Sequence, residues 1–291
     1  MSVVISLSEA RAETAPAPVA KVHGIGRIAF SSQDGETRLK DLYQHDPLRI
    51  LFPHRAPDDI ASAVFVTTSG GLVGGDVLEM TGHADVGACV QMTAQAAEKV
   101  YRSNGADCHI DVDLGAGEGA WLEWLPQETI AFDGARMVRR TRADVAPGGS
   151  MLAGEFLVLG RTAMGEKVQS GLICDEWEIR RDGRLVWADA LRLDGDIAET
   201  VSHPGGLAGA TAMATVVYVA DDAPEKVELA RELLEANQDV RVGVTAVNGI
   251  LVVRFLGTDG FTLRATFGDF WAAFRHEVQG LPNQLPRIWH I

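Results

Sequence analysis

The stretch Glu176–Asp194 (EWEIRRDGRLVWADALRLD) decides the fold class. Trp177 and Ile179 alternate with charged residues as far as Asp182-Gly183, and a second alternating run follows. Alternation with a period of two is typical of a half-buried strand. Because Asp-Gly between two such runs is a strong hairpin signal, this segment predicts an antiparallel β-hairpin.

The same period-two pattern extends outward from the hairpin and covers most of residues 22–220. Turn-forming pairs recur at short intervals, at Asp34-Gly35, Gly115–Gly119, Asp133-Gly134, Pro147–Gly149 and Asp259-Gly260. Many short strands with frequent turns indicate a mainly antiparallel β architecture. Helices of 10–15 residues do not alternate with these strands, so a parallel α/β sheet is not expected. We find no repeat of fixed period.

A small helical part is expected near the C-terminus. Residues 224–238 have one apolar side, with Asp222 as a candidate N-cap. In residues 263–278 the aromatic spacing favours a second amphipathic helix. Between them, residues 241–256 predict a hairpin that turns at Asn248-Gly249. Residues 91–102 are ambiguous between helix and strand.

Composition and charge exclude several classes of function. The chain has 291 residues, 46% of them hydrophobic, with 26 Lys+Arg and 40 Asp+Glu and a net charge of −14. This balance argues against binding to nucleic acid or to an anionic membrane surface. Three cysteines without CxxC spacing predict reduced thiols and a cytoplasmic location. We expect residues 1–20 to be a flexible tail and residues 21–291 to form a single β-rich domain.

The first segment with possible chemistry is a glycine-rich loop, Thr67–Asp76 (TTSGGLVGGD). A phosphate-binding P-loop would end in GK[ST], whereas this loop ends in Gly75-Asp76. Its glycines can simply form a tight turn. The functional alternative is that the Asp76 carboxylate faces a cation.

The second segment, Trp121–Ala135, carries Glu123, Glu128 and Asp133. Paired carboxylates can act in acid–base catalysis or bind a metal through oxygen. One alternative is therefore a β-rich hydrolase that uses Glu123 or Glu128 with Asp133, and another is that these are solvated strand edges.

Two further interpretations rest on other side chains. Arg161 lies between Glu155 and Glu166 in the sequence, which favours a structural ion pair. A β-sandwich binding module would instead present an exposed aromatic platform, built from the side chains Trp121, Trp124 or Trp177. The eight histidines form no metal-binding motif, and the sequence contains no GxSxG or GxGxxG motif.

Five segments read together resemble the UreD (UreH) family of urease accessory proteins. They are GGLVGGD (70–76), QAAEKVYRS (95–103), LEWLPQETIAFDGA (122–135), EFLVLGRTAMGE (155–166) and LPRIW (285–289). The resemblance runs from about residue 26 to residue 289, and no part of the first 20 residues shares it. It implies stacked antiparallel or mixed sheets in a β-helical arrangement, with a small C-terminal helical part.

The resemblance also implies a function. UreD-like proteins are not enzymes. They bind apo-urease and a helical partner, UreF, which in turn binds the GTPase UreG, and the assembly supports GTP-dependent delivery of nickel. An internal tunnel is thought to conduct the metal, so we expect transient Ni²⁺ and no tightly bound cofactor.

The carboxylates in the resembling segments are the candidates for this nickel path. Asp76, Glu128 and Glu166 are expected along it, as weak and transient metal ligands. A second group is expected to line the path or to hold it open, namely Glu98, Arg102, Glu155 and Arg161.

Overall fold

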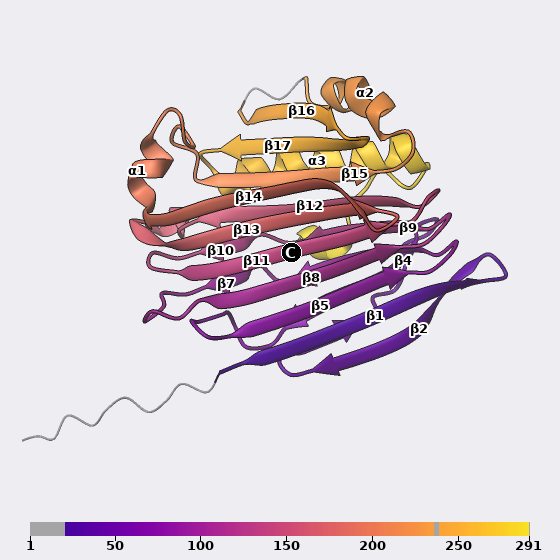
Figure 1. The fold of residues 1–291 in the computed structure, drawn as a ribbon, viewed down its shortest axis with the longest axis horizontal. Coiled ribbons are helices and arrows are strands. Elements are labelled where there is room, and N and C mark those ends of the chain that lie inside the picture. The colour runs from indigo at the N-terminus through magenta and orange to yellow at the C-terminus, as the bar shows by residue number, and fades with distance from the viewer. Residues whose placement is uncertain (1–20, 236–238, 291) are drawn as a thin grey trace, which may run out of the picture.

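The computed structural model describes residues 21–235 and 239–290, which form two facing β-sheets and a few helices (Figure 1). The predicted N-terminal tail and Ala236–Gln238 lie outside the described residues. The seven-stranded sheet consists, in spatial order, of β14 (Arg184–Asp196), β13 (Ser170–Arg181), β11 (Arg136–Val145), β8 (Cys108–Ala116), β5 (Val77–Ala84), β1 (His23–Gln33) and β2 (Glu36–His45).

The second sheet has ten strands and carries the C-terminal elements. Its main path is β16 (Arg241–Val247), β17 (Ile250–Gly257), β15 (Ala212–Val219), β12 (Ser150–Leu159), β9 (Trp121–Pro126), β6 (Cys89–Gln95), β4 (Ala61–Thr67) and β3 (Leu48–Leu51). The short strands β7 (Glu98–Val100) and β10 (Thr129–Ala131) pair with each other, and β10 also pairs with β12.

The chain passes from one sheet to the other at each coil, which gives the predicted β-helical arrangement. β5, β8 and β11 lie parallel in the seven-stranded sheet, and β6, β9 and β12 lie parallel in the ten-stranded sheet. Antiparallel pairs such as β1–β2 and β15–β17 flank these parallel centres. The mainly antiparallel architecture that the frequent turns indicated is therefore wrong for the middle of both sheets.

Three short arches between the sheets explain this difference. Each has four residues, at 85–88, 117–120 and 146–149, and the third residue is a glycine at positive φ: 68° at Gly87, 65° at Gly119 and 70° at Gly148. The arches stack, since Gly87 N donates to Glu118 O (2.9 Å) and Gly119 N donates to Gly148 O (3.1 Å). A turn sequence that looks like a hairpin therefore sends the chain to the opposite sheet.

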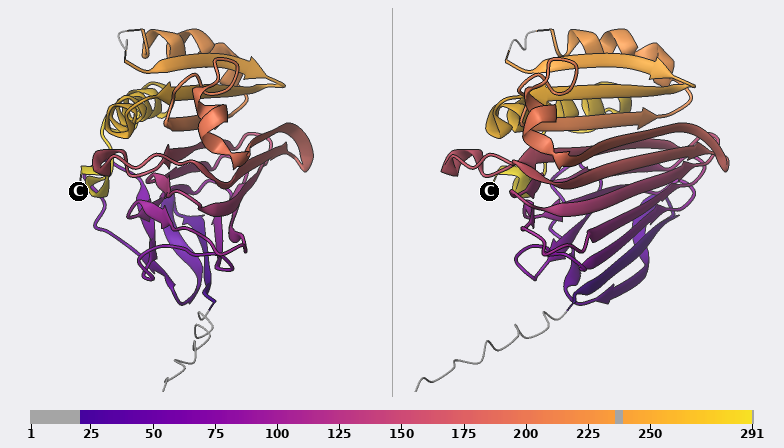
Figure 2. Two further views of the ribbon diagram at one scale, coloured as in Figure 1. Left: turned by 90° about the vertical axis from the view of Figure 1, so that its left-hand side faces the viewer. Right: turned by 60° about the vertical axis from the view of Figure 1, so that its left-hand side comes forward.

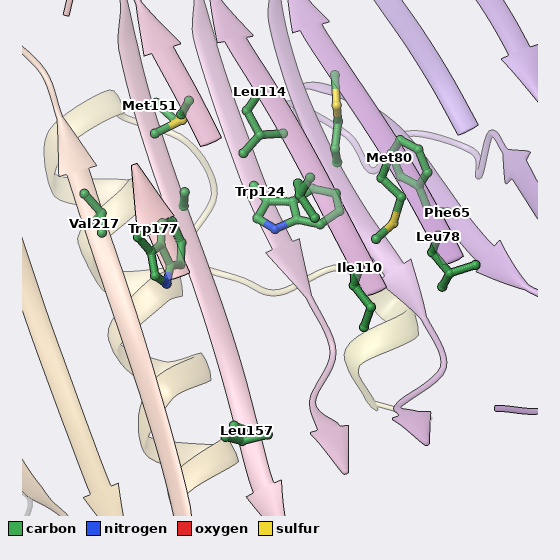
Figure 3. Close-up of a cluster of buried hydrophobic side chains, with 14 of the residues drawn as sticks. Phe65, Leu78, Met80, Ile110, Leu114, Trp124, Met151, Leu157, Trp177 and Val217 are labelled. Atoms are coloured by element: carbon green, nitrogen blue, oxygen red, sulfur yellow. The ribbon is translucent and has the colours of Figure 1, made fainter. Parts of the chain in front are cut away.

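The main hydrophobic core fills the space between the sheets. Figure 3 shows Met80, Ile110 and Trp177 of the seven-stranded sheet in the same cluster as Phe65 and Trp124 of the ten-stranded sheet. Trp121, Trp124 and Trp177 are at most 2% exposed. The exposed aromatic platform that a binding module would need is therefore not formed by these side chains.

Helices cover the outer face of the ten-stranded sheet (Figure 2). The helix α3 (Gly260–Gln279) begins at Asp259, whose side chain accepts from Thr262 N, and ends at Gly280. Its Phe267, Trp271 and Phe274 are fully buried against the sheet, which confirms the predicted amphipathic helix.

The other local predictions have mixed outcomes. The hairpins at Asp182-Gly183 and Asn248-Gly249 are confirmed. Residues 91–102 contain the strands β6 and β7 and no helix. In place of one helix over 224–238, the described residues form the 3₁₀ turn η2 (Ala223–Lys226) and a short α2 (Val227–Glu232), and Asp222 makes no capping hydrogen bond.

The remaining helical elements are short. α1 (Ile197–Ser202) follows β14, while the 3₁₀ turns η1 (Thr162–Met164) and η3 (Arg287–His290) lie after β12 and at the C-terminus. No helix within residues 21–235 or 239–290 has the length and apolar character needed to cross a bilayer.

A buried ion network fixes α3 to the ten-stranded sheet. Arg275 is fully buried, and its Nε donates to Glu123 Oε1 (2.8 Å) while Nη2 donates to Asp59 Oδ1 (2.7 Å). Glu123 also accepts from Gln91 Nε2 (2.6 Å) and Trp121 Nε1 (2.9 Å). Because every oxygen of this buried carboxylate has a donor, it can stay charged inside the core.

Arg275→Met should lower the free energy of unfolding by about 3–5 kcal/mol, because it leaves the Glu123 carboxylate buried without its counter-charge. Chemical denaturation monitored by circular dichroism measures this. Arg38→Met is the matched control, since Arg38 pairs with Glu36 on the exposed strand β2 and should matter little. An equal loss in both variants would contradict the role of the buried network.

Candidate functional site

Three charged side chains lie between the two sheets, at positions where apolar residues are expected. Arg139 on β11 is 2% exposed and Glu155 on β12 is 4% exposed. Arg139 Nη1 lies 2.7 Å from Glu155 Oε2, and Nε and Nη2 donate to the two oxygens of Asp175 on β13 at 2.9 and 2.7 Å. These residues, here called the interior triad, join the two sheets through charge-assisted hydrogen bonds.

Neutral groups hold the triad in position. Trp124 Nε1 and Thr141 Oγ1 donate to Glu155 Oε1 at 3.0 and 3.1 Å, and Arg139 Nη1 donates to Thr129 Oγ1 at 3.0 Å. Burial raises the pKa of Glu155 and the charge of Arg139 opposes that shift. Burial alone would lower the pKa of Arg139, but the charges of Asp175 and Glu155 outweigh it and raise that pKa.

A cavity lies on each side of the triad. The first, with about 40 Å³ of space for water, is lined by Thr67, Glu98 and Gln127 together with Arg139 and Glu155. This is enough for at least one ordered water. The second, of about 360 Å³, is lined by residues that include Glu155, Asp175, Asp189, Thr215 and Arg254. Glu155 therefore belongs to the walls of both cavities.

Glu98 is a second carboxyl in the wall of the first cavity, beside Glu155. Burial raises its pKa to about 7, although a hydrogen bond from Thr67 opposes the shift, and the nearby charge of Asp76 adds to it. A carboxyl with this pKa is partly protonated and partly ionised at neutral pH. The ionised form can bind a cation, and protonation of the carboxyl can release that cation at little cost in free energy.

Polar side chains continue from the triad to the rim of the second cavity. Glu155, Thr215 and Arg254 lie in register on β12, β15 and β17. Arg254 Nη1 donates to Thr215 Oγ1 (3.1 Å), and Nη2 pairs with Asp189 of β14 at 2.6 Å. The Arg254 and Asp189 side chains are 43% and 31% exposed, so the second cavity reaches the surface at this pair.

Of the predicted site residues, Asp76, Glu98 and Glu155 gather around this interior region. Asp76 is 2% exposed, and its carboxylate accepts from Val22 N (3.0 Å) and Val73 N (2.9 Å). It thus fixes the glycine loop to the start of β1. The same loop lies next to β7, which carries Glu98, since Leu72 N donates to Lys99 O (2.7 Å).

The other predicted residues lie elsewhere. Arg161 forms a bidentate pair with Glu166 at 2.9 and 3.1 Å, while Arg102 pairs with Asp133. These four side chains line one surface pocket with Tyr101, Phe132 and Lys167. The predicted ion pair of Arg161 is confirmed for Glu166, whereas Glu155 pairs with Arg139 instead.

Glu128 lies at a third place, under the C-terminal segment. It pairs with Arg264 of α3, and Arg264 Nη2 also donates to Trp289 O (2.8 Å). Asp76, Glu128 and Glu166 are therefore not brought together. In the part of the chain that the structure describes, no three His, Cys, Asp or Glu side chains are grouped so that they could hold a metal ion.

The carboxylates of the hydrolase interpretation are also separated by their partners. Glu123 pairs with Arg275, Glu128 with Arg264 and Asp133 with Arg102. Each carboxylate is thus neutralised by its own arginine, in a different part of the structure. The pairing of two carboxylates that acid–base catalysis requires is therefore not formed by these three residues.

Sequence reasoning missed Arg139 and Asp175, although a signal for both was present. In the segment 137–145 (MVRRTRADV), Arg139 occupies the inward phase with Met137 and Thr141. Asp175 lies between the inward residues Ile173 and Trp177. A charge in the inward phase of a strand marks a residue that needs a buried partner.

The free energy of unfolding should depend on pH through the titration of the Glu98 carboxyl. Because its pKa is raised from 4.5 to about 7 in the folded protein, folding favours the protonated form. This contribution is complete below pH 4.5 and is lost as the pH rises through 7. Wild type should therefore lose stability relative to Glu98→Gln over this range, measured by denaturation at a series of pH values. Parallel curves for the two proteins would contradict the shift.

Comparison with known proteins identifies the family. The family described as UreD urease accessory protein matches residues 22–290. The urease accessory protein UreD of Magnetococcus marinus is 42% identical over 278 residues, covering 94% of this chain and 96% of its own. That of Xanthobacter autotrophicus is 44% identical over 263 residues, covering 90% and 88%. Such accessory proteins are non-catalytic maturation factors, which replaces the hydrolase interpretation. The chain belongs to the UreD family of urease accessory proteins.

Proposed function

We propose that this chain is a cytoplasmic scaffold of urease maturation that conducts Ni²⁺ through the space between its two sheets. In this proposal it binds apo-urease and a UreF-like helical protein, which brings a UreG-like GTPase into the complex. The metal is cargo and is held transiently. The observation that carries the proposal is the position of Glu155, which lines both interior cavities.

The chemistry of the interior supports passage rather than storage. A conduit needs sites that a cation enters readily and leaves readily. The cavities offer carboxylates and hydroxyls, and Ni²⁺ is held less firmly by such oxygen donors than by imidazole or thiolate. Glu98, with a pKa of about 7, can exchange a proton for a cation at neutral pH.

The remaining predicted residues have narrower proposed roles. Asp76 shapes the loop at the Glu98 end of the interior, and Arg102 and Arg161 hold the surface pocket that also contains Glu166. Glu128 anchors the C-terminal segment through Arg264. As weak, transient nickel ligands along the path, Asp76, Glu128 and Glu166 stay a prediction.

Co-purification tests the scaffold role. Tagged protein is expressed with UreF-like and UreG-like partners and apo-urease, and urease activity is assayed after addition of nickel, bicarbonate and GTP. Recovery of a complex and activation that depends on this chain are expected. If no partner associates and activation proceeds equally without the chain, the proposed function is wrong.

Glu98→Gln tests the conduit separately from assembly. The amide keeps the size of the side chain but cannot become a charged ligand, so urease activation at limiting nickel should fall several-fold while the complex is still recovered. Glu178→Gln is the matched control, because Glu178 lies on the solvent side of β13, where it pairs with Arg180. Full activation by the Glu98 variant at limiting nickel would contradict the conduit.

A further inference from the structure

We propose that Arg139 is the gate of the interior route, because its guanidinium fills the position between Glu155 and Asp175 that a divalent cation must use to pass between the two cavities. The inference rests on the proposed function, since a gate presupposes cation transit. The first observation is the arrangement of the walls: Arg139 lines the first cavity, Asp175 lines the second, and Glu155 lines both.

The guanidinium occupies a position suited to a cation. Two carboxylates from different strands converge on it, with Nη1 2.7 Å from Glu155 and a bidentate contact to Asp175 at 2.9 and 2.7 Å. Charge-assisted bonds of this kind are among the strongest side-chain contacts, and the rigid fork of arginine matches carboxylate geometry. While Arg139 is in place, its positive charge repels a second cation and its bonds use the oxygens that would bind one.

The carboxylate of Glu155 does not depend on Arg139 for its orientation. Trp124 and Thr141 both donate to Glu155 Oε1, whereas Arg139 contacts Oε2. When the guanidinium moves away, Glu155 is still held in place as an oxygen ligand. The protein thus contains a preorganised cation position that its own arginine occupies.

A second resting place for the guanidinium lies within the same cavity. Glu98 lines the first cavity together with Arg139 and Glu155. An arginine that leaves Glu155 can therefore exchange one carboxylate partner for another within the same cavity. This arrangement makes displacement by an incoming divalent cation feasible at the cost of an exchange of ion pairs.

Removal of Arg139 should convert the conduit into a trap. Arg139→Met leaves Glu155 and Asp175 facing each other without a counter-charge. In equilibrium dialysis of the purified full chain against nickel chloride, this variant should retain several-fold more nickel than wild type at a new saturable site. The additional Glu155→Gln substitution should abolish the gain.

Arg142→Met is the matched control, since Arg142 lies on the same strand and pairs with two carboxylates, Asp111 and Asp113, on the solvent side. It frees as many carboxylates but should add no saturable nickel site. Thermal unfolding and circular dichroism confirm that each variant is folded. Nickel retention equal to wild type in folded Arg139→Met, or an equal gain in Arg142→Met, overturns the gate.

If Arg139→Met does not fold, Arg139→Lys decides the question. Lysine supplies the charge that the two carboxylates need but lacks the bidentate fork, so it should hold the position less firmly and let nickel compete. Nickel should then raise the melting temperature of this variant more than that of wild type, because a ligand that binds only the folded state stabilises it. Equal shifts in the two proteins overturn the proposal.

The two proposals fail in distinguishable ways. If the chain is not a urease scaffold, wild type has no effect on urease activation, whatever amount of nickel the variants retain. If Arg139 is not a gate, nickel retention is unchanged by its substitution, whatever wild type does for urease. When both proposals hold, Arg139→Met still assembles with its partners but lowers activation at limiting nickel, because the metal stays in the chain.

Discussion

The whole structure depends on one backbone constraint, the crossing from the seven-stranded to the ten-stranded sheet within four residues at three successive coils. A chain that crosses this quickly cannot return beside the strand it has left, so successive strands of one sheet come to lie parallel. The stacked arches satisfy the constraint with a left-handed glycine at the same position and with hydrogen bonds from one arch to the next. The backbones of neighbouring arches also approach each other closely, since a Cβ atom on Gly149 would lie 2.4 Å from Gly117 O.

Parallel coiling also determines where interior charges can lie. Because strands stay in register from coil to coil, one inward position on β11 faces the matching position on β13, and this places Arg139 beside Asp175. Glu155 reaches the same point from the opposite sheet. A fold with a purely apolar interior would not leave cavities whose walls include carboxylate and hydroxyl oxygens. The interior triad therefore maintains polar space within a core that is otherwise close-packed.

Features that depend on residues close together in the sequence were predicted more reliably than those that depend on distant residues. The hairpins at 182–183 and 248–249 and the helix α3 follow from turn chemistry and periodicity within a few residues, and all were predicted. The parallel centres were not, because Pro147–Gly149 has the composition of a hairpin turn and only tertiary packing shows which sheet it leads to. The resemblance to UreD supplied the β-helical arrangement that these turns obscured.

Candidate-site prediction failed where partners are far apart in the sequence. Glu128 meets Arg264 across 136 positions, and Arg139 meets Asp175 across 36. No spacing rule links such residues. The sequence does contain one usable signal, the phase of the alternation between inward and outward residues. Arg139 faces inward, whereas Arg140 and Arg142 face outward. That signal identifies a buried charge but not the two carboxylates that neutralise it.

In the sequence α3 follows all the strands that it covers, which has a consequence for synthesis on the ribosome. The strands that α3 covers emerge before it does, so their outer face, with Phe156, Val216 and Phe255, stays bare until residues 260–290 have left the exit tunnel. During that interval the nascent chain presents a large apolar surface that α3 will later cover. Such transient exposure favours aggregation and chaperone binding. Slow synthesis of residues 260–290 therefore prolongs the exposure of this apolar face.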